Sequence, residues 1–182
     1  MTTPHIAVLG LGNLMRTDDA VGMLALQQLR ADPRLPQTVP LIEGGTLGLE
    51  LLYPLEGITH LLALDAIDAG ARPGTLLRYG GEEIDKLPVS KSVHLLGFSD
   101  LIGALRLTEN DLRETVVLGV QPEKIDWGTE LTPTVKGALV TLVESAIGQV
   151  TRWLGDAAEQ AGMPAEGDIP QMAAAAEEAW YW

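Results

Sequence analysis

The chain has 182 residues, of which 46% are hydrophobic, and it contains no cysteine. This length and apolar content suffice for one domain with a buried core, while the missing cysteines exclude disulfides, thiolate metal sites and a cysteine nucleophile. The formal net charge of −13 argues against nucleic acid as a partner, because phosphates attract basic surfaces.

Apolar runs of strand length alternate with helical patterns along the chain, which predicts a single α/β domain over residues 1–154. We expect three layers, α/β/α, around a mainly parallel twisted sheet. The expected strands are 5–11, 38–42, 59–64, 75–79 (an edge strand) and 114–120. The expected helices begin at Asp18 or Asp19 and end near Leu29, and then span 47–55, 95–105 and 132–154, the last opened by Pro133.

Residues 155–182 differ from the body of the chain in composition. Their periodicity fades into Gly, Pro, Ala and acidic residues, and they hold six acidic residues without any Lys or Arg. We expect a mobile acidic tail there, with a short helix at 171–180. The N-terminus lacks a signal-peptide pattern, and no apolar run approaches the ~18 residues that cross a bilayer, so we expect a cytoplasmic protein without a membrane partner.

Three polar residues stand where the carboxyl ends of parallel strands would form a ligand crevice. Asp19 falls in a first helical turn, where an acid also favours the helix dipole. Asp65 closes an apolar run, where a carboxylate costs desolvation energy unless it is paired or binds a cation. His94 opens a helical stretch, a position that also suits a surface or capping residue. Two carboxylates and one imidazole suit Zn, Ni, Mn or Fe better than Ca, although spacing alone does not establish the site.

A nucleotide-binding function is a weaker alternative. Gly10-Leu11-Gly12 follows the first strand, and Glu43 could imitate a ribose-binding acid. The third glycine of the fingerprint would fall at Met15, however, and no Walker lysine follows the turn. A serine nucleophile is also disfavoured, because no Gly-x-Ser-x-Gly elbow occurs.

From Ile6 to Trp153 the chain resembles the nickel–iron hydrogenase maturation endopeptidases. The motifs that carry the resemblance are Gly10-Leu11-Gly12-Asn13, Thr17-Asp18-Asp19, Glu43-Gly44-Gly45-Thr46, Asp65-Ala66, Pro73-Gly74, His94-Leu95-Leu96-Gly97, Gly119-Val120-Gln121-Pro122 and Leu131-Thr132-Pro133. The family's metal-contacting positions correspond to Asp19, Asp65 and His94. Glu43 stands where the family has Asp, and the acidic tail has no counterpart.

The resemblance implies an endopeptidase that cleaves the C-terminal extension from the nickel-loaded precursor of a hydrogenase large subunit. Nickel would be supplied by that precursor, and other divalent metals could take its place. Either Asp19 or Asp65 would activate water, or the ion would polarise the scissile carbonyl.

The same resemblance implies that Gly44, Gly45 and Thr46 bind substrate, because glycine turns let the backbone approach a bound strand. Asp18 would support the helix start, and the protein would act as a monomer. The alternative function is a non-catalytic nickel-binding chaperone or metal-binding module that uses the same three ligands.

Overall fold

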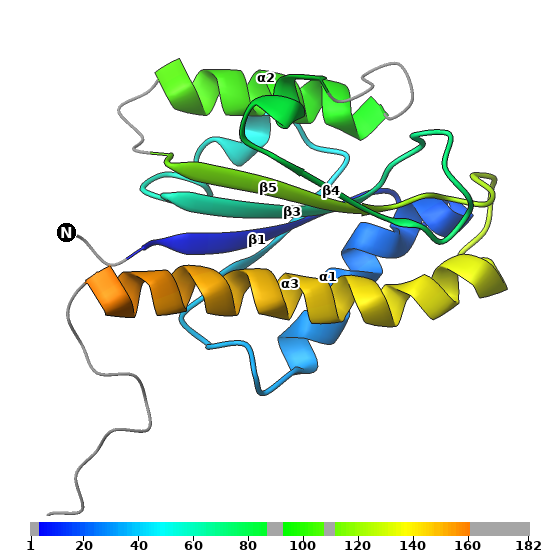
Figure 1. Ribbon diagram of the computed structural model, residues 1–182. Helices are drawn as coiled ribbons and strands as arrows, with labels where there is room; N and C mark the ends of the chain where they lie inside the picture. Colours follow the sequence, from blue (N-terminus) through cyan, green and yellow to red (C-terminus); the bar gives the residue numbers. More distant parts are fainter. Residues whose placement is uncertain (1–3, 87–92, 108–111, 161–182) are drawn as a thin grey trace, which may run out of the picture.

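A five-stranded sheet forms the middle layer of the molecule (Figure 1). The computed structural model describes residues 4–86, 93–107 and 112–160, although some side chains within these ranges, those of 93–96 among them, are not described. The strands are β1 (Ile6–Leu11), β2 (Leu41–Gly45), β3 (His60–Ala66), β4 (Leu76–Gly80) and β5 (Glu114–Val120). Their order is β2-β1-β3-β5-β4, with β4 antiparallel at one edge and the others parallel, which confirms the expected α/β class.

Helices cover both faces of this sheet. The helices α1 (Val21–Ala31) and α3 (Pro133–Gln160) lie on one face, and α2 (Val93–Leu107) lies on the other (Figure 1). Side chains alternate between the faces along each strand. In β1, Ile6 and Val8 therefore join the core under α1 and α3, whereas Ala7 and Leu9 join the core under α2. Burial on both faces explains why the central strands are continuous apolar runs.

The element boundaries differ from the sequence expectations in a few places. The helix expected at 47–55 is wrong, because only a short 3₁₀ helix, η2 (Leu49–Leu51), forms there. Pro54 and the neighbouring Gly48 and Gly57 leave too few residues for a stable α-helix. The strand β2 begins at Leu41, three residues later than expected, and α3 continues to Gln160.

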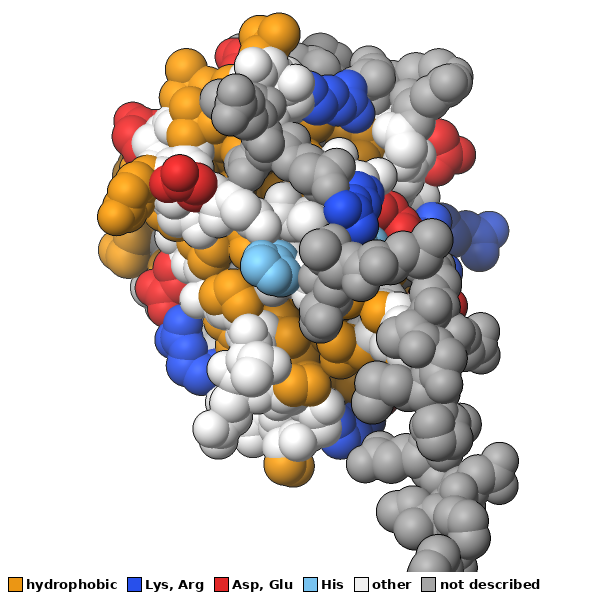
Figure 2. All heavy atoms as spheres, turned by 90° about the vertical axis from the view of Figure 1, so that its left-hand side faces the viewer, with side chains coloured by type: hydrophobic (Ala, Val, Ile, Leu, Met, Phe, Trp, Pro, Cys, Tyr) orange, Lys and Arg blue, Asp and Glu red, His pale blue; other side chains and the backbone are white. Residues whose placement is uncertain are grey.

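The two ends of the sheet present different surfaces. The links that follow β1 and β5 lie at the carboxyl edge, on the right in Figure 1. Figure 2 looks at the opposite, amino-terminal edge, where hydrophobic side chains lie among scattered charged ones. No helix within the described residues is both long and apolar enough to cross a membrane.

Candidate active site

Asp19 is held at the carboxyl edge by the link that follows β1. It belongs to a 3₁₀ helix, η1 (Thr17–Ala20), that leads into α1, and its side chain is only 7% exposed. Its Oδ2 accepts a hydrogen bond of 3.0 Å from the backbone N–H of Asn13. Gly12 makes this approach possible, because it has a φ of +118° and a Cβ there would lie 1.9 Å from the carbonyl oxygen of Asp19.

Asp65 lies at the end of β3 and is fully buried. Every second residue of a strand lies on the same face, and Leu61 and Ala63 belong to the core under α2. The side chain of Asp65 therefore lies on that face of the sheet. Its Oδ1 accepts the backbone N–H of Ala66 at 2.8 Å. The helical segment η1 contacts β3, and a Cβ at Gly22 would lie 2.2 Å from the carbonyl oxygen of Leu64. The segments that carry the two carboxylates therefore pack directly against each other.

His94 lies in the first turn of α2, but its side chain is outside the described part of the structure. One turn further along, Gly97 approaches Gly48, in the link that follows β2, so this end of α2 lies beside the carboxyl edge. Among the side chains that the structure describes, no three His, Cys, Asp or Glu residues form a group that could hold a metal ion. The three-ligand site therefore stays a prediction.

The glycine pair at the end of β2 shapes the same edge. Gly44 is buried against Leu9 and Leu11, and Gly45 has a φ of +53°. The carbonyl of Gly45 accepts the N–H of Gly12 at 2.8 Å, which ties this turn to the one that positions Asp19. Thr46 is exposed, and the role of 44–46 in substrate binding stays a prediction. Glu43 pairs with Arg30 at 2.9 Å on the surface.

The chain has close relatives among proteases that mature hydrogenases. The family model described as hydrogenase maturation protease, HycI, matches residues 23–149. The hydrogenase 2 maturation protease of Escherichia coli strain K12 is 36% identical over 159 residues, which is 86% of this chain and 94% of that protein. The chain belongs to the hydrogenase maturation protease family. The resemblance noted in the sequence motifs is thereby confirmed.

Solved structures agree with this family assignment. The hydrogenase maturating endopeptidase HybD of E. coli superposes with a TM-score of 0.77 at 35% identity, covering 81% of this chain and 93% of that chain. The [NiFe] hydrogenase maturation protease HybD of Thermococcus kodakarensis gives a TM-score of 0.67 at 28% identity, covering 78% and 96%. The protein is therefore an endopeptidase that acts in hydrogenase maturation.

Asp18 has a role in this maturation protease that sequence reasoning missed. We expected it to support the helix start, but its fully buried carboxylate reaches across to the link between β5 and α3. It accepts the backbone N–H groups of Glu123, Lys124 and Thr132 at 2.7–2.9 Å and the Thr132 hydroxyl at 3.0 Å. Asp18 thus fixes the segment 123–132 beside the segment that carries Asp19.

Gln121 similarly connects the exits of β3 and β5. It is 5% exposed, and its Oε1 accepts the backbone N–H groups of Ala69 and Ala71. Its Nε2 donates to Asp68 Oδ1 at 3.0 Å. The Gly-Val-Gln-Pro motif at 119–122 was the only sequence signal for this residue. Its contacts order the chain that leaves Asp65.

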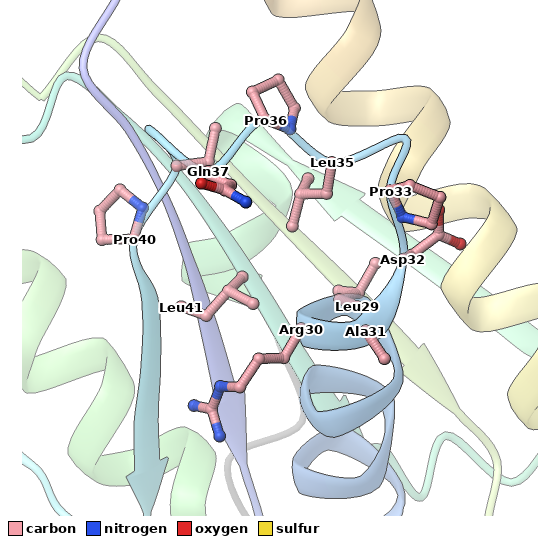
Figure 3. Close-up of a pocket in the computed structure, with 11 residues that line it drawn as sticks. Leu29, Arg30, Ala31, Asp32, Pro33, Leu35, Pro36, Gln37, Pro40 and Leu41 are labelled. Atoms are coloured by element: carbon pink, nitrogen blue, oxygen red, sulfur yellow. The ribbon is translucent and has the colours of Figure 1, made fainter.

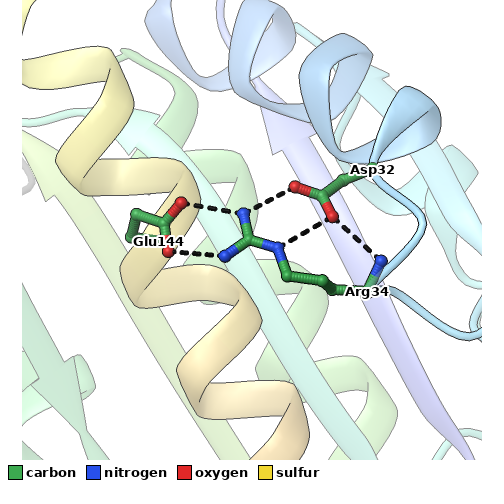
Figure 4. Close-up of polar contacts among 3 residues, drawn as sticks. All are labelled: Asp32, Arg34 and Glu144. Atoms are coloured by element: carbon green, nitrogen blue, oxygen red, sulfur yellow. Dashed lines mark hydrogen bonds and ion pairs between the residues drawn. The ribbon is translucent and has the colours of Figure 1, made fainter.

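A groove of about 700 Å³ lies away from this site, between the end of α1 and the start of β2 (Figure 3). Leu35 and Leu41 lie in it, and Pro33, Pro36 and Pro40 line it. Next to it, the guanidinium of Arg34 lies between the carboxylates of Asp32 and Glu144 (Figure 4). These residues connect α1 and β2 to α3 at the amino-terminal edge, far along the strands from Asp19 and Asp65.

Proposed function

We propose that this endopeptidase cleaves the C-terminal extension from the nickel-loaded precursor of a [NiFe]-hydrogenase large subunit, and that Asp19, Asp65 and His94 bind the precursor's nickel. The proposal keeps the cytoplasmic location and monomeric state expected from the sequence. The observation that carries it is the pair of buried carboxylates at the carboxyl edge, on segments that pack against each other. Carboxylates in such surroundings are good ligands for a divalent cation, whose charge offsets their desolvation.

The fold holds both carboxylate ligands in place. Asp19 accepts the backbone N–H of Asn13 and Asp65 accepts that of Ala66, which fixes the direction of each carboxylate. A preorganised pair of this kind completes the coordination of an incoming ion at little cost in side-chain entropy. Nickel in this proposal is part of the substrate, so the free protease needs no high metal affinity of its own.

The chemistry requires a nucleophilic water and a polarised scissile carbonyl. A carboxylate of the site takes the proton from the attacking water, or the substrate's nickel acts as the Lewis acid on the carbonyl. Both routes need the scissile peptide to lie beside Asp19 and Asp65. Gly12 and Gly45 have no side chain in the turns beside the two carboxylates, so the backbone of a substrate strand can come close there.

The first test is cleavage of purified precursor in its nickel-loaded and nickel-free forms, followed by mass spectrometry. We expect the protease to shorten only the nickel-loaded precursor, at its C-terminal end. Equal cleavage of both forms would remove nickel from the recognition step. Stable binding of the precursor without any shortening would favour the nickel-binding chaperone instead.

The second test addresses the ligands. We expect Asp19→Asn, Asp65→Asn and His94→Ala each to reduce the cleavage rate by about a hundredfold or more, as loss of a metal-site or acid–base group typically does. The matched controls are Asp156→Asn and His5→Ala, because both side chains are exposed and lie away from the carboxyl edge, near the end of α3 and just before β1. Circular dichroism of every variant checks the fold. Unchanged cleavage by one variant would remove that residue from the site.

A further inference from the structure

Large exposed hydrophobic side chains gather at the carboxyl edge. Nine such side chains are exposed within the described residues, and six of them lie in three short segments, 14–15, 47–49 and 125–127, that come soon after the ends of β1, β2 and β5: Leu14, Met15, Leu47, Leu49, Ile125 and Trp127. Trp127 is 77% exposed and Met15 is 55% exposed. Single exposed apolar residues are ordinary, but a concentration beside an active site is typical of a binding surface.

Four of the six lie on two links that are joined to each other. The backbone N–H of Thr17 donates to the carbonyl of Gly128 at 2.8 Å, and the N–H of Gly128 donates to the carbonyl of Met15 at 3.0 Å. The two joined links therefore form one surface, which carries Leu14 and Met15 on one link and Ile125 and Trp127 on the other. We call this surface the apolar platform. Asp18 anchors the same two links from below with its buried carboxylate.

The backbone of this support is unusually constrained. Thr17 has a φ of +39°, the one positive value at a non-glycine residue among those described. Strain of this kind is retained where surrounding contacts impose it, often at binding sites. A platform that is already ordered loses little conformational entropy when a ligand binds.

Arg16 adds a polar group to the platform. Its guanidinium lies 5.8 Å from the centre of the Trp127 ring, in cation–π geometry. The residue is half-buried, and its Nε is in the buried part, without a hydrogen-bond partner among the described residues. A ligand would therefore be contacted by the remainder of the guanidinium. The other charges nearby compensate each other, since Lys124 pairs with Asp126 at 3.2 Å. The platform therefore offers apolar area together with a hydrogen-bond donor for a carbonyl.

We propose that the apolar platform binds an extended, apolar segment of the precursor next to the scissile bond, with Arg16 donating to one of its backbone carbonyls. This inference rests on the proposed function for the identity of the substrate. It follows from continuity with the site, because Asn13, which directly precedes Leu14, holds the Asp19 carboxylate. The net charge of −13 disfavours other occupants. Two copies of the chain repel each other at this charge, and an anionic lipid surface repels the chain as well.

The test separates binding from catalysis by steady-state kinetics on the nickel-loaded precursor. We expect Trp127→Ala and Met15→Ala each to raise KM roughly tenfold and to leave kcat within about twofold, as loss of an aromatic or apolar anchor does. Arg16→Lys, which keeps the cation but lacks the guanidinium fork, should raise KM by a smaller factor. The matched controls are Leu107→Ala and Val140→Ala, because both side chains are exposed but lie in the helices α2 and α3, outside the carboxyl-edge links.

Direct binding completes the test, because it does not require cleavage. Precursor affinity is compared between Asp65→Asn and the double variant Asp65→Asn/Trp127→Ala by surface plasmon resonance. A roughly tenfold weaker affinity of the double variant supports the platform even if cleavage itself fails, which would contradict only the proposed function. Equal affinities, or unchanged KM in Trp127→Ala and Met15→Ala while the wild type cleaves, would overturn the platform. A concentration-dependent dimer that Trp127→Ala abolishes would assign the surface to self-association instead and so overturn it too.

Discussion

Two links at opposite edges of the sheet are held in place in different ways. Between α1 and β2, Leu35 and Val39 are buried, and Arg34 forms ion pairs with the half-buried Asp32 and the exposed Glu144. Between β5 and α3, a buried carboxylate fixes the link, and Ile125 and Trp127 are exposed. The first link buries its apolar side chains, whereas the second exposes two of its own and is held by the buried carboxylate of Asp18 in η1.

The difference indicates which link is scaffold and which is interface. Exposed ion pairs contribute little to stability, so burial of Leu35 and Val39 must hold the α1–β2 link in place. The β5–α3 link gains no such burial from Ile125 or Trp127. The order of the β5–α3 link depends on hydrogen bonds to the buried carboxylate of Asp18. Each such bond to a charged group stabilises more than a hydrogen bond between two neutral groups. A link ordered in this way keeps its apolar side chains available for a partner.

The largest expected effect comes from Gly12→Ala. A Cβ would meet the carbonyl oxygen of Asp19 at 1.9 Å, and the φ of +118° is unfavourable for alanine, so the Asp19 turn must move. We expect a loss of cleavage activity of about a hundredfold or more, since displacement by about 1 Å has this effect on catalysis. Gly57→Ala is the control, because Gly57 also has a positive φ but open space around it. Equal activities of the two variants would contradict this account.

Asp18→Ala should have the next largest effect. It leaves the N–H groups of Glu123, Lys124 and Thr132 without their acceptor, which we expect to lower the free energy of unfolding by about 3 kcal/mol. Chemical denaturation measures this change, and hydrogen exchange should increase in the β5–α3 link before the rest of the sheet. The exposed Asp100→Ala is the control. Undiminished protection of that link would show that other contacts order it.

Arg34→Ala should have the smallest effect, and its effect should depend on pH. Hydrogen bonds from Arg34 lower the pKa of Asp32 from 3.8 to about 2, and the same side chain lowers the pKa of Glu144. Because the pKa values are lower in the folded state, the stabilisation is present above the unfolded pKa values and is lost as pH falls toward 2.

Thermal unfolding of Arg34→Ala and wild type measures this contribution. We expect a small decrease in Tm at neutral pH, as is usual for exposed ion pairs, and no difference near the pKa of about 2. The exposed Arg152→Ala is the control. A difference in Tm that persists at low pH would assign the role of Arg34 to packing instead of charge.

Local patterns in the sequence predicted most of the fold and little of the support around the site. The central strands were evident because burial on both faces requires uninterrupted apolar residues, as in β3 and β5. The stretch 47–55 was wrongly predicted as an α-helix because its leucines have helical spacing. Pro54 and the flanking glycines instead limit the helix to one short 3₁₀ turn.

The candidate ligands were found through their position after strands, but their supports were not. Asp18 and Thr132 are separated by 114 positions in the sequence, so no local pattern connects them. The same is true of Gln121 and the turn at Ala69, which lie 52 positions apart. Trp127 and Met15 drew no attention as a pair, because only the joined links bring them to one surface.

Asp18 is far along the chain from the backbone N–H groups of 123–132 that it accepts, and this distance has a consequence during protein synthesis. A nascent chain that has emerged from the ribosome only as far as β3 contains Asp19 and Asp65 but lacks the segment at 123–132 that Asp18 anchors. The support of the candidate site can be completed only after β5 and the start of α3 have left the ribosome. We therefore expect the protease to become competent late in its own translation, once all five strands are available.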